Sequence, residues 1–213
     1  MLAVPVAASS WKTETLEQLR QLRQKSPGLS HCIVFLDDFI LSRKVDTKRI
    51  VSLAAAAVEF DIAYLRLKHL EEGLFRRVYQ FLQPKRILGN ENVIRIRDSH
   101  PYYSSLQIAI WSIDHLEKMV SEAGNIWLFE HLQDPGQPHY TVLNTVFQYR
   151  HVVEKGAWET GAKKYCEKKI GWFSAGNRKM NSDSIISEIR LKFKKLIFFF
   201  FGYSIMSIKK RLK

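Results

Sequence analysis

Cysteine, proline and glycine are all scarce in this chain of 213 residues, which has 2, 6 and 10 of them respectively. The two cysteines, Cys32 and Cys166, cannot build a disulfide scaffold, and no Cys-x-x-Cys or Cys/His spacing suggests a zinc site. The low glycine and proline content excludes a collagen-like or low-complexity chain. Because 46% of the residues are hydrophobic and 12% are aromatic, we expect a folded protein with a real core, in a reducing compartment such as the cytosol.

Acidic residues are outnumbered, since 21 Asp and Glu against 33 Lys and Arg give a formal net charge of +12. The excess is concentrated at the end of the chain: residues 188–213 hold eight basic residues and one acid, which accounts for +7. The rest of the chain is only mildly basic. We therefore expect no specific nucleic-acid partner, and a basic nucleic-acid-binding module is the weakest of the alternatives.

Apolar runs of transmembrane length are also missing. A helix needs about 20 apolar residues to span a bilayer, and the uncharged run at residues 196–208 has 13, with lysines on both sides. Such a run with basic flanks is typical of a segment that lies on an anionic membrane surface. The alternative is a C-terminal helix packed on the core. The first interpretation predicts a cytoplasmic protein attached to the inner face of the cell membrane.

The hydrophobic pattern predicts helices alternating with strands, and so an α/β fold. The expected helices cover residues 11–25, 46–60 and 113–122, with a short helix at 127–132. The expected strands cover residues 32–36, 62–67, 93–97, 106–111 and 141–153. The continuous apolar run at 32–36 predicts a strand covered on both faces, as in a parallel sheet. We expect one domain at 11–180, followed by a basic amphipathic tail at 183–213.

Two adjacent carboxylates, Asp37 and Asp38, follow the apolar run at 32–36. Residues beyond the carboxyl end of a parallel strand lie where α/β sheets bind ligands. Carboxylate oxygens suit Mg²⁺ or Mn²⁺, which commonly bind through one or two carboxylates together with substrate phosphates. The pair is therefore a candidate cofactor-binding site, with Asp38 as the metal ligand. The alternative is that one Asp caps a turn while the other is solvated.

Aromatic and polar residues crowd the segment 101–111, which reads PYYSSLQIAIW. Tyr102, Tyr103 and Trp111 could pack their rings on sugar faces. Gln107 needs hydrogen-bond partners if it is buried, which indicates a fixed role. These four residues are candidate substrate-binding residues. The alternative is an aromatic core in which Gln107 holds a loop backbone.

A single carboxylate, Glu130, stands among aromatic residues in the segment WLFE at 127–130. Burial would raise the pKa of this carboxyl group toward the range that is useful to a general base. Glu130 is therefore the candidate catalytic residue. The alternative is an ion pair between Glu130 and one of the many basic residues.

Taken in order, these segments resemble a family of bacterial glycosyltransferase-like proteins with the GT-A fold, related to the family-2 glycosyltransferases. The segments that carry the resemblance are VFLDDFIL (34–41), VDTKRI (45–50), PYYSSLQIAIW (101–111), WLFE (127–130) and VVEKGAW (152–158). The resemblance implies a GT-A-like, Rossmann-like mixed sheet flanked by helices. It also implies that Asp38, with Asp37 beside it, contacts Mg²⁺ or Mn²⁺ and a nucleotide diphosphate, and that Glu130 deprotonates an acceptor hydroxyl group.

By the same resemblance, Tyr102, Tyr103, Gln107 and Trp111 line the acceptor or the donor sugar. The partners implied are a nucleotide-sugar donor and a cell-surface polysaccharide or lipid-linked acceptor, with an anionic membrane surface bound through the C-terminal tail. In this family, a nucleotide-binding region normally precedes the acidic motif, and here one helix and a short apolar leader precede it. We therefore expect a sheet that lacks its first strands. The alternative function is a non-catalytic relic that acts as a peripheral membrane or interaction protein.

Overall fold

The computed structural model describes residues 11–69, 85–98, 100, 103–134, 136–154, 156–174 and 176–180. The chain divides into two compact units. Unit 1 consists of Met1–Leu36 and Val45–Phe147, and unit 2 consists of Asp37–Lys44 and Gln148–Lys213. The tail expected at 183–213 and the candidate residue Tyr102 lie outside the described residues.

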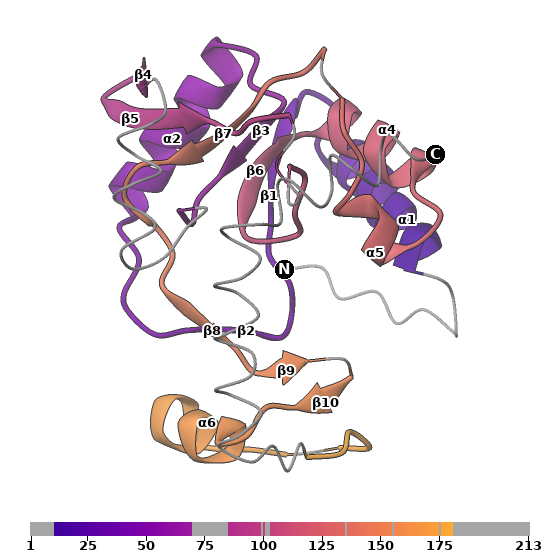
Figure 1. Ribbon diagram of the computed structural model, residues 1–213, viewed down its shortest axis with the longest axis vertical. Helices are drawn as coiled ribbons and strands as arrows, with labels where there is room; N and C mark the ends of the chain where they lie inside the picture. The colour runs from indigo at the N-terminus through magenta and orange to yellow at the C-terminus, as the bar shows by residue number, and fades with distance from the viewer. Residues whose placement is uncertain are drawn as a thin grey trace. The chain divides into compact units, whose positions relative to one another are not determined.

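Unit 1 contains a six-stranded sheet in the order β1-β6-β3-β7-β5-β4 (Figure 1). Its strands are β1 (His31–Val34), β3 (Tyr64–Arg66), β4 (Lys85–Leu88), β5 (Glu91–Arg95), β6 (Ala109–Ser112) and β7 (His139–Val142). Strands β3 and β7 are parallel, and the other neighbouring pairs in this sheet are antiparallel. With the helices that flank it, this mixed sheet confirms the coarse expectation of an α/β fold.

The first strand was predicted to be covered on both faces, as in a parallel sheet, and the structure differs on both points. Strand β1 is antiparallel to β6 rather than parallel to a neighbour, and it lies at one edge of the sheet. Cys32 and Val34 pack against the core, whereas Ile33 between them is 41% exposed. A continuous apolar run is consistent with a strand covered on both faces, but the run does not fix how many strands lie beside it.

Two further strand predictions need correction. The segment expected as one strand at 141–153 contains parts of β7, β8 (Tyr149–His151) and β9 (Val153–Glu154), with a turn region between β7 and β8. The expected strand at 93–97 is β5, and its hairpin partner β4 was not predicted. Gly89 closes the tight turn between them with a φ of +57°, a conformation that glycine adopts at little cost.

Three helices of unit 1 begin at residues that the sequence predicts. Helix α1 covers Trp11–Lys25, α2 covers Thr47–Glu59 and α4 covers Ile113–Glu122. The Asp46 carboxylate caps α2 by accepting a hydrogen bond from the Arg49 backbone N–H at 3.1 Å. Ser112 caps α4 in the same way, through the backbone N–H of His115. Each cap satisfies one backbone N–H that has no partner inside its own helix.

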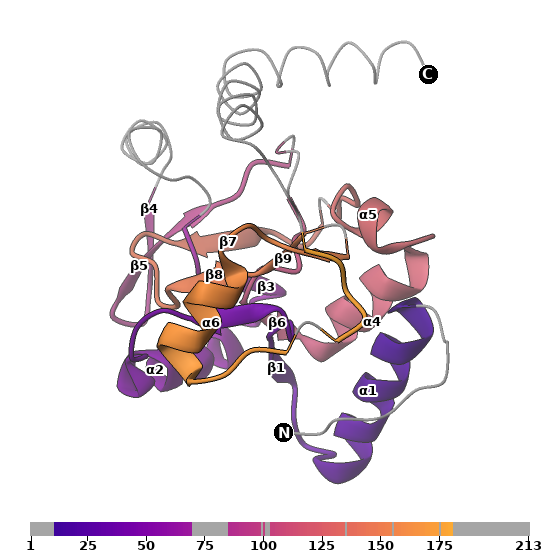
Figure 2. The same cartoon turned by 90° about the horizontal axis from the view of Figure 1, so that it is seen from below.

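The helices cover the sheet on both of its faces. Helices α1 and α4 lie side by side (Figures 1 and 2), and residues from both belong to the core cluster that contains Tyr64 and Trp111. Because side chains alternate along a strand, Leu65 points to the other face, where it is fully buried. Helix α2 contacts the two edge strands, β1 and β4, and so crosses that second face.

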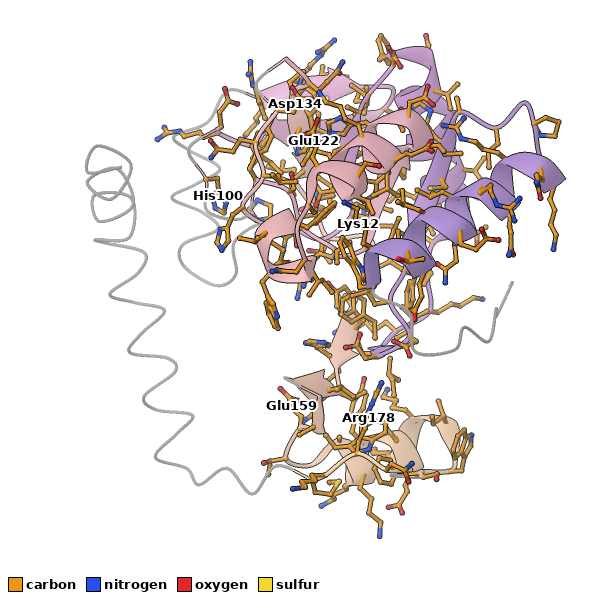
Figure 3. All side chains as sticks on the ribbon, turned by 90° about the vertical axis from the view of Figure 1, so that its right-hand side faces the viewer. Lys12, His100, Glu122, Asp134, Glu159 and Arg178 are labelled. Atoms are coloured by element: carbon orange, nitrogen blue, oxygen red, sulfur yellow. The ribbon has the colours of Figure 1, made fainter. Side chains whose placement is uncertain are left out.

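Unit 2 is built from two short strand pairs and one helix. Strand β2 (Phe39–Leu41) pairs with β8, and β9 pairs with β10 (Ala157–Trp158). Helix α6 (Ala162–Ile170) packs through Ala162 and Cys166 onto Val152 and Val153. An ion pair of 3.2 Å joins Arg150 on β8 to Glu159, which is labelled in Figure 3. Unit 2 therefore has a small core of its own.

Within the described part of the chain, no helix combines the length and the apolar character needed to cross a membrane.

Candidate functional site

The predicted acidic pair lies in unit 2, directly before β2. Asp37 is exposed, whereas the Asp38 side chain retains only 17% of its accessible surface. His151 Nε2 lies 2.6 Å from Asp38 Oδ2, within hydrogen-bond distance. Asp38 Oδ1 is buried and has no hydrogen-bond partner among the described residues. Since a buried carboxylate oxygen without a partner is costly, this atom marks a place where a donor or a cation would be stabilised.

The pairing of β2 with β8 sets the position of Asp38. Phe39 is opposite His151 in the strand register, and the Phe39 ring stacks on Tyr149 with ring centroids 4.4 Å apart. The backbone N–H of Val152 donates to the carbonyl oxygen of Asp38 at 3.1 Å. The contact of His151 with Asp38 could not be expected from a single strand at 141–153, because it depends on the pairing of residue 39 with residue 151.

The donor set at Asp38 fits a divalent cation only in part. No group of three or more His, Cys, Asp or Glu side chains that could hold a metal ion is found in the described ranges. Asp38 and His151 offer one carboxylate and one imidazole. Mg²⁺ and Mn²⁺ are commonly held by one or two protein carboxylates, with phosphates and waters completing the shell. The residues therefore fit a cation that arrives with a diphosphate better than they fit a permanent metal centre.

The predicted general base, Glu130, lies in unit 1 immediately after α5 (Ile126–Phe129). Its side chain is half-buried, and Ser105 Oγ donates to Glu130 Oε1 at 3.4 Å. Burial raises the pKa of Glu130 above its ordinary value, while the bond from Ser105 and the positive charge of Arg66 offset part of that rise. The direction of this pKa shift agrees with the expected effect of burial, and it brings the carboxyl group closer to the range of an effective general base. The role of general base itself stays a prediction.

Two of the candidate substrate-binding residues are fully buried in unit 1. Trp111 on β6 packs edge-on against Tyr64 with centroids 4.4 Å apart, and its indole Nε1 has no hydrogen-bond partner among the described residues. The Tyr103 hydroxyl group donates to the carbonyl oxygen of Gln137 at 2.7 Å. Neither ring is exposed to solvent, which agrees with the alternative of an aromatic core. Gln107 is half-buried, and its backbone N–H donates to Ser105 Oγ at 3.2 Å.

A buried histidine pair stands beside this aromatic core. His139 Nδ1 lies 3.0 Å from the carbonyl oxygen of Tyr103, so this nitrogen carries the proton and donates it. His139 Nε2 must then accept from His115 Nε2, which is 2.8 Å away. Burial lowers the pKa of His139 to about 3 and also lowers the pKa of His115, so both rings are neutral near pH 7. The bonded network thus fixes the tautomer of each ring.

His115 of this pair also borders a cavity of about 280 Å³ in unit 1. Polar residues dominate its lining, which consists of Asp61, Ala63, Ser112, Asp114, His115, Lys118, Asp134 and Gln137. Asp134, labelled in Figure 3, forms an ion pair of 2.5 Å with Lys118, and its Oδ2 lies 3.9 Å from His115 Nδ1. No single stretch of the sequence points to this cavity, because its lining residues come from three separate segments of the chain.

The predicted site residues thus fall into two groups. Asp37 and Asp38 belong to unit 2, whereas Tyr103, Gln107, Trp111 and Glu130 belong to unit 1. A scan against protein-family models matches no family, and a search of the curated proteins finds no similar sequence. The family resemblance carried by the sequence motifs therefore stays a prediction.

Proposed function

We propose that this chain is a glycosyltransferase-like protein with a GT-A-like fold. Its donor is a nucleotide sugar, and its acceptor is a cell-surface polysaccharide or a lipid-linked intermediate at an anionic membrane surface. The order of the acidic, aromatic and WLFE segments along the chain supports the proposal. So does the mixed sheet with helices on both faces.

One observation carries the proposal furthest, and it concerns Asp38. Its Oδ2 is held by His151 while its Oδ1 is buried without a partner among the described residues. In the proposed function Asp38 holds Mg²⁺ or Mn²⁺, with His151 orienting the carboxylate and Asp37 contributing negative charge beside it. When bound, such an ion supplies positive charge that stabilises a leaving diphosphate.

Glu130 has the second role in the proposal. Its carboxylate takes the proton from an acceptor hydroxyl group as the oxygen of that group bonds to the anomeric carbon of the donor sugar. The bond from the anomeric carbon to the diphosphate oxygen breaks, and the electron pair leaves with the diphosphate. The raised pKa of Glu130 supports this role, because a base works best when its pKa lies near the working pH.

The test is a calorimetric titration of the purified chain with UDP, with and without Mn²⁺. We expect UDP binding to depend on the metal and to weaken at least about tenfold in Asp38→Asn, since one ligand of the cation loses its charge. Glu167→Gln is the matched control, because it removes a carboxylate charge from unit 2 on the exposed side of α6. Metal-independent binding, or equal binding by Asp38→Asn and the control, would contradict the proposal.

The alternative is a non-catalytic relic of the same fold that acts as a peripheral membrane or interaction protein. The burial of Tyr103 and Trp111 favours it, because neither ring is presented to a ligand. The same titration separates the two functions. If the folded chain binds neither UDP nor GDP with Mn²⁺, the result supports the relic.

A further inference from the structure

Arg66, at the end of β3, is a buried charge for which the described residues provide no hydrogen-bond partner at Nε. The residue is 8% exposed, and its Nε is fully buried with no hydrogen-bond partner among the described residues. Arginine stays protonated under all ordinary conditions, so burial does not remove this charge. A buried guanidinium group is costly unless an anion or several acceptors surround it. The Arg66 guanidinium group thus lacks, among the described residues, the partner that its burial calls for.

The position of Arg66 follows from the register of three strands. Arg66 is opposite Ala109 on β6 and Thr141 on β7, so it shares a sheet face with Tyr64. The neighbour of Arg66 on β6 therefore has only a methyl side chain. Arg66 also ends a strand that is parallel to β7, and α/β sheets bind ligands beyond the carboxyl ends of such strands.

Polar groups from the neighbouring segment line the same end of the sheet. The Tyr64 hydroxyl group donates to the carbonyl oxygen of Ser105 at 3.2 Å, and Ser105 Oγ donates to Glu130. Glu130 is near enough for the charge of Arg66 to act on it, yet no ion pair between the two is found within 4.0 Å in the described part of the chain. Glu130 thus feels the charge of Arg66 without providing a partner for its Nε.

We propose that Arg66 is the centre of an oxyanion-binding site in unit 1, which takes a phosphate or carboxylate group of a ligand. The planar guanidinium group donates two parallel N–H bonds to such a group, and a bidentate pair of this kind is strong and specific. This inference goes beyond the proposed function, because it concerns an anion held by the protein without a metal. Where the proposed function also holds, the acceptor carries an acidic group close to the hydroxyl group that Glu130 deprotonates.

The experiment is a calorimetric titration with inorganic phosphate and, separately, with glucuronate, in a phosphate-free buffer that contains EDTA. Glucose serves as the neutral probe. Three proteins are compared: the unmodified chain, Arg66→Met and the control Arg95→Met. Arg95 is an exposed arginine of the same unit, paired with Asp98 at 3.3 Å. We expect Arg66→Met to weaken anion binding at least about tenfold, Arg95→Met to leave it unchanged, and glucose to show no binding.

The two anions distinguish the chemical source of the oxyanion. Tighter binding of phosphate indicates a phosphorylated or diphosphate-linked ligand, and tighter binding of glucuronate indicates an acidic sugar. Equal binding by Arg66→Met and the unmodified chain would overturn the inference. So would the absence of binding for both anions. EDTA keeps this result separate from the Mn²⁺-dependent binding of UDP, so either proposal can fail alone.

Two further measurements guard against a purely structural role for Arg66. If Arg66 lacks an internal partner, Arg66→Met removes an uncompensated charge, and the midpoint temperature of unfolding stays unchanged or rises. A large fall would mean that Arg66 is paired inside the protein, which would overturn the inference. In the unmodified chain, the Nε–H resonance of Arg66 should shift and saturate during the phosphate titration. A resonance that does not move would also overturn the inference.

Discussion

Replacing Trp111 tests whether its ring belongs to the core or to a ligand site. The ring is fully buried, and it contacts Tyr64, Phe129 and His115 with centroids 4.4, 5.7 and 5.9 Å away. Truncating a tryptophan in such a position to alanine costs about 3–5 kcal/mol in free energy of unfolding. At about 2–4 °C per kcal/mol for a chain of this size, Trp111→Ala should lower the midpoint temperature by roughly 6–20 °C.

Trp111→Phe should behave very differently. The smaller ring leaves a cavity of roughly 40 Å³, which costs about 1 kcal/mol. Against this, the substitution removes an indole N–H that is buried without a partner among the described residues, and such a group costs about 1–3 kcal/mol. The two effects nearly cancel. We expect the free energy of unfolding of Trp111→Phe to lie within about 1 kcal/mol of the unmodified chain, or above it.

The assay is urea unfolding followed by far-ultraviolet circular dichroism for the three proteins. The reasoning is refuted if Trp111→Ala lowers the free energy of unfolding by less than about 1 kcal/mol, because removing a ring from the centre of the core should destabilise the protein by more than this. It is also refuted if Trp111→Phe costs more than about 3 kcal/mol, since the indole N–H would then have a partner.

Three further predictions concern a helix cap and two titrating groups. Asp46→Ala should cost about 1 kcal/mol of unfolding free energy, because α2 loses its N-cap; a thermal melt by circular dichroism that shows no loss would contradict this. The folded pKa of His139, about 3, lies below its ordinary value of 6.5, so the folded chain binds fewer protons between these pH values. The free energy of unfolding should therefore fall as the pH is lowered through this window, by about 1.4 kcal/mol per pH unit. Urea unfolding at several pH values measures this slope, and His139→Gln should flatten it. Arg66→Met should raise the pKa of Glu130 further, because the charge of Arg66 lowers it; an unchanged ¹³C carboxyl titration would refute this coupling.

Much of the helical structure could be predicted because its signals are local. Helix α4 begins after its cap Ser112 and α2 begins after its cap Asp46, and both caps stand beside regular apolar spacing in the sequence. The mixed α/β class also followed from local patterns. The pairing of β1 did not, because five apolar residues in a row are compatible with an edge strand and with a central one.

The functional groups could be predicted only where residues adjacent in the sequence determine their chemistry. The raised pKa of Glu130 was expected, although the group that bonds to it, Ser105, lies 25 residues earlier in the chain. His151 and Arg66 were not predicted as functional residues, because strand pairing determines the surroundings of each side chain. His151 meets Asp38 through the β2–β8 pair, and Arg66 is buried through its neighbours on β6 and β7. No local pattern in one sequence gives such a register.

The most direct test of the central claim locates Mn²⁺ itself. Mn²⁺ is paramagnetic and broadens the resonances of nearby protons, so the ring signals of His151 report on a cation held by Asp38, which lies 2.6 Å from His151 Nε2. With UDP present, we predict that substoichiometric Mn²⁺ broadens these signals in the unmodified chain and in Glu167→Gln, but not in Asp38→Asn. Sharp His151 signals in the folded, unmodified chain with UDP and Mn²⁺, or equal broadening in Asp38→Asn, would contradict a metal-dependent donor site at Asp38.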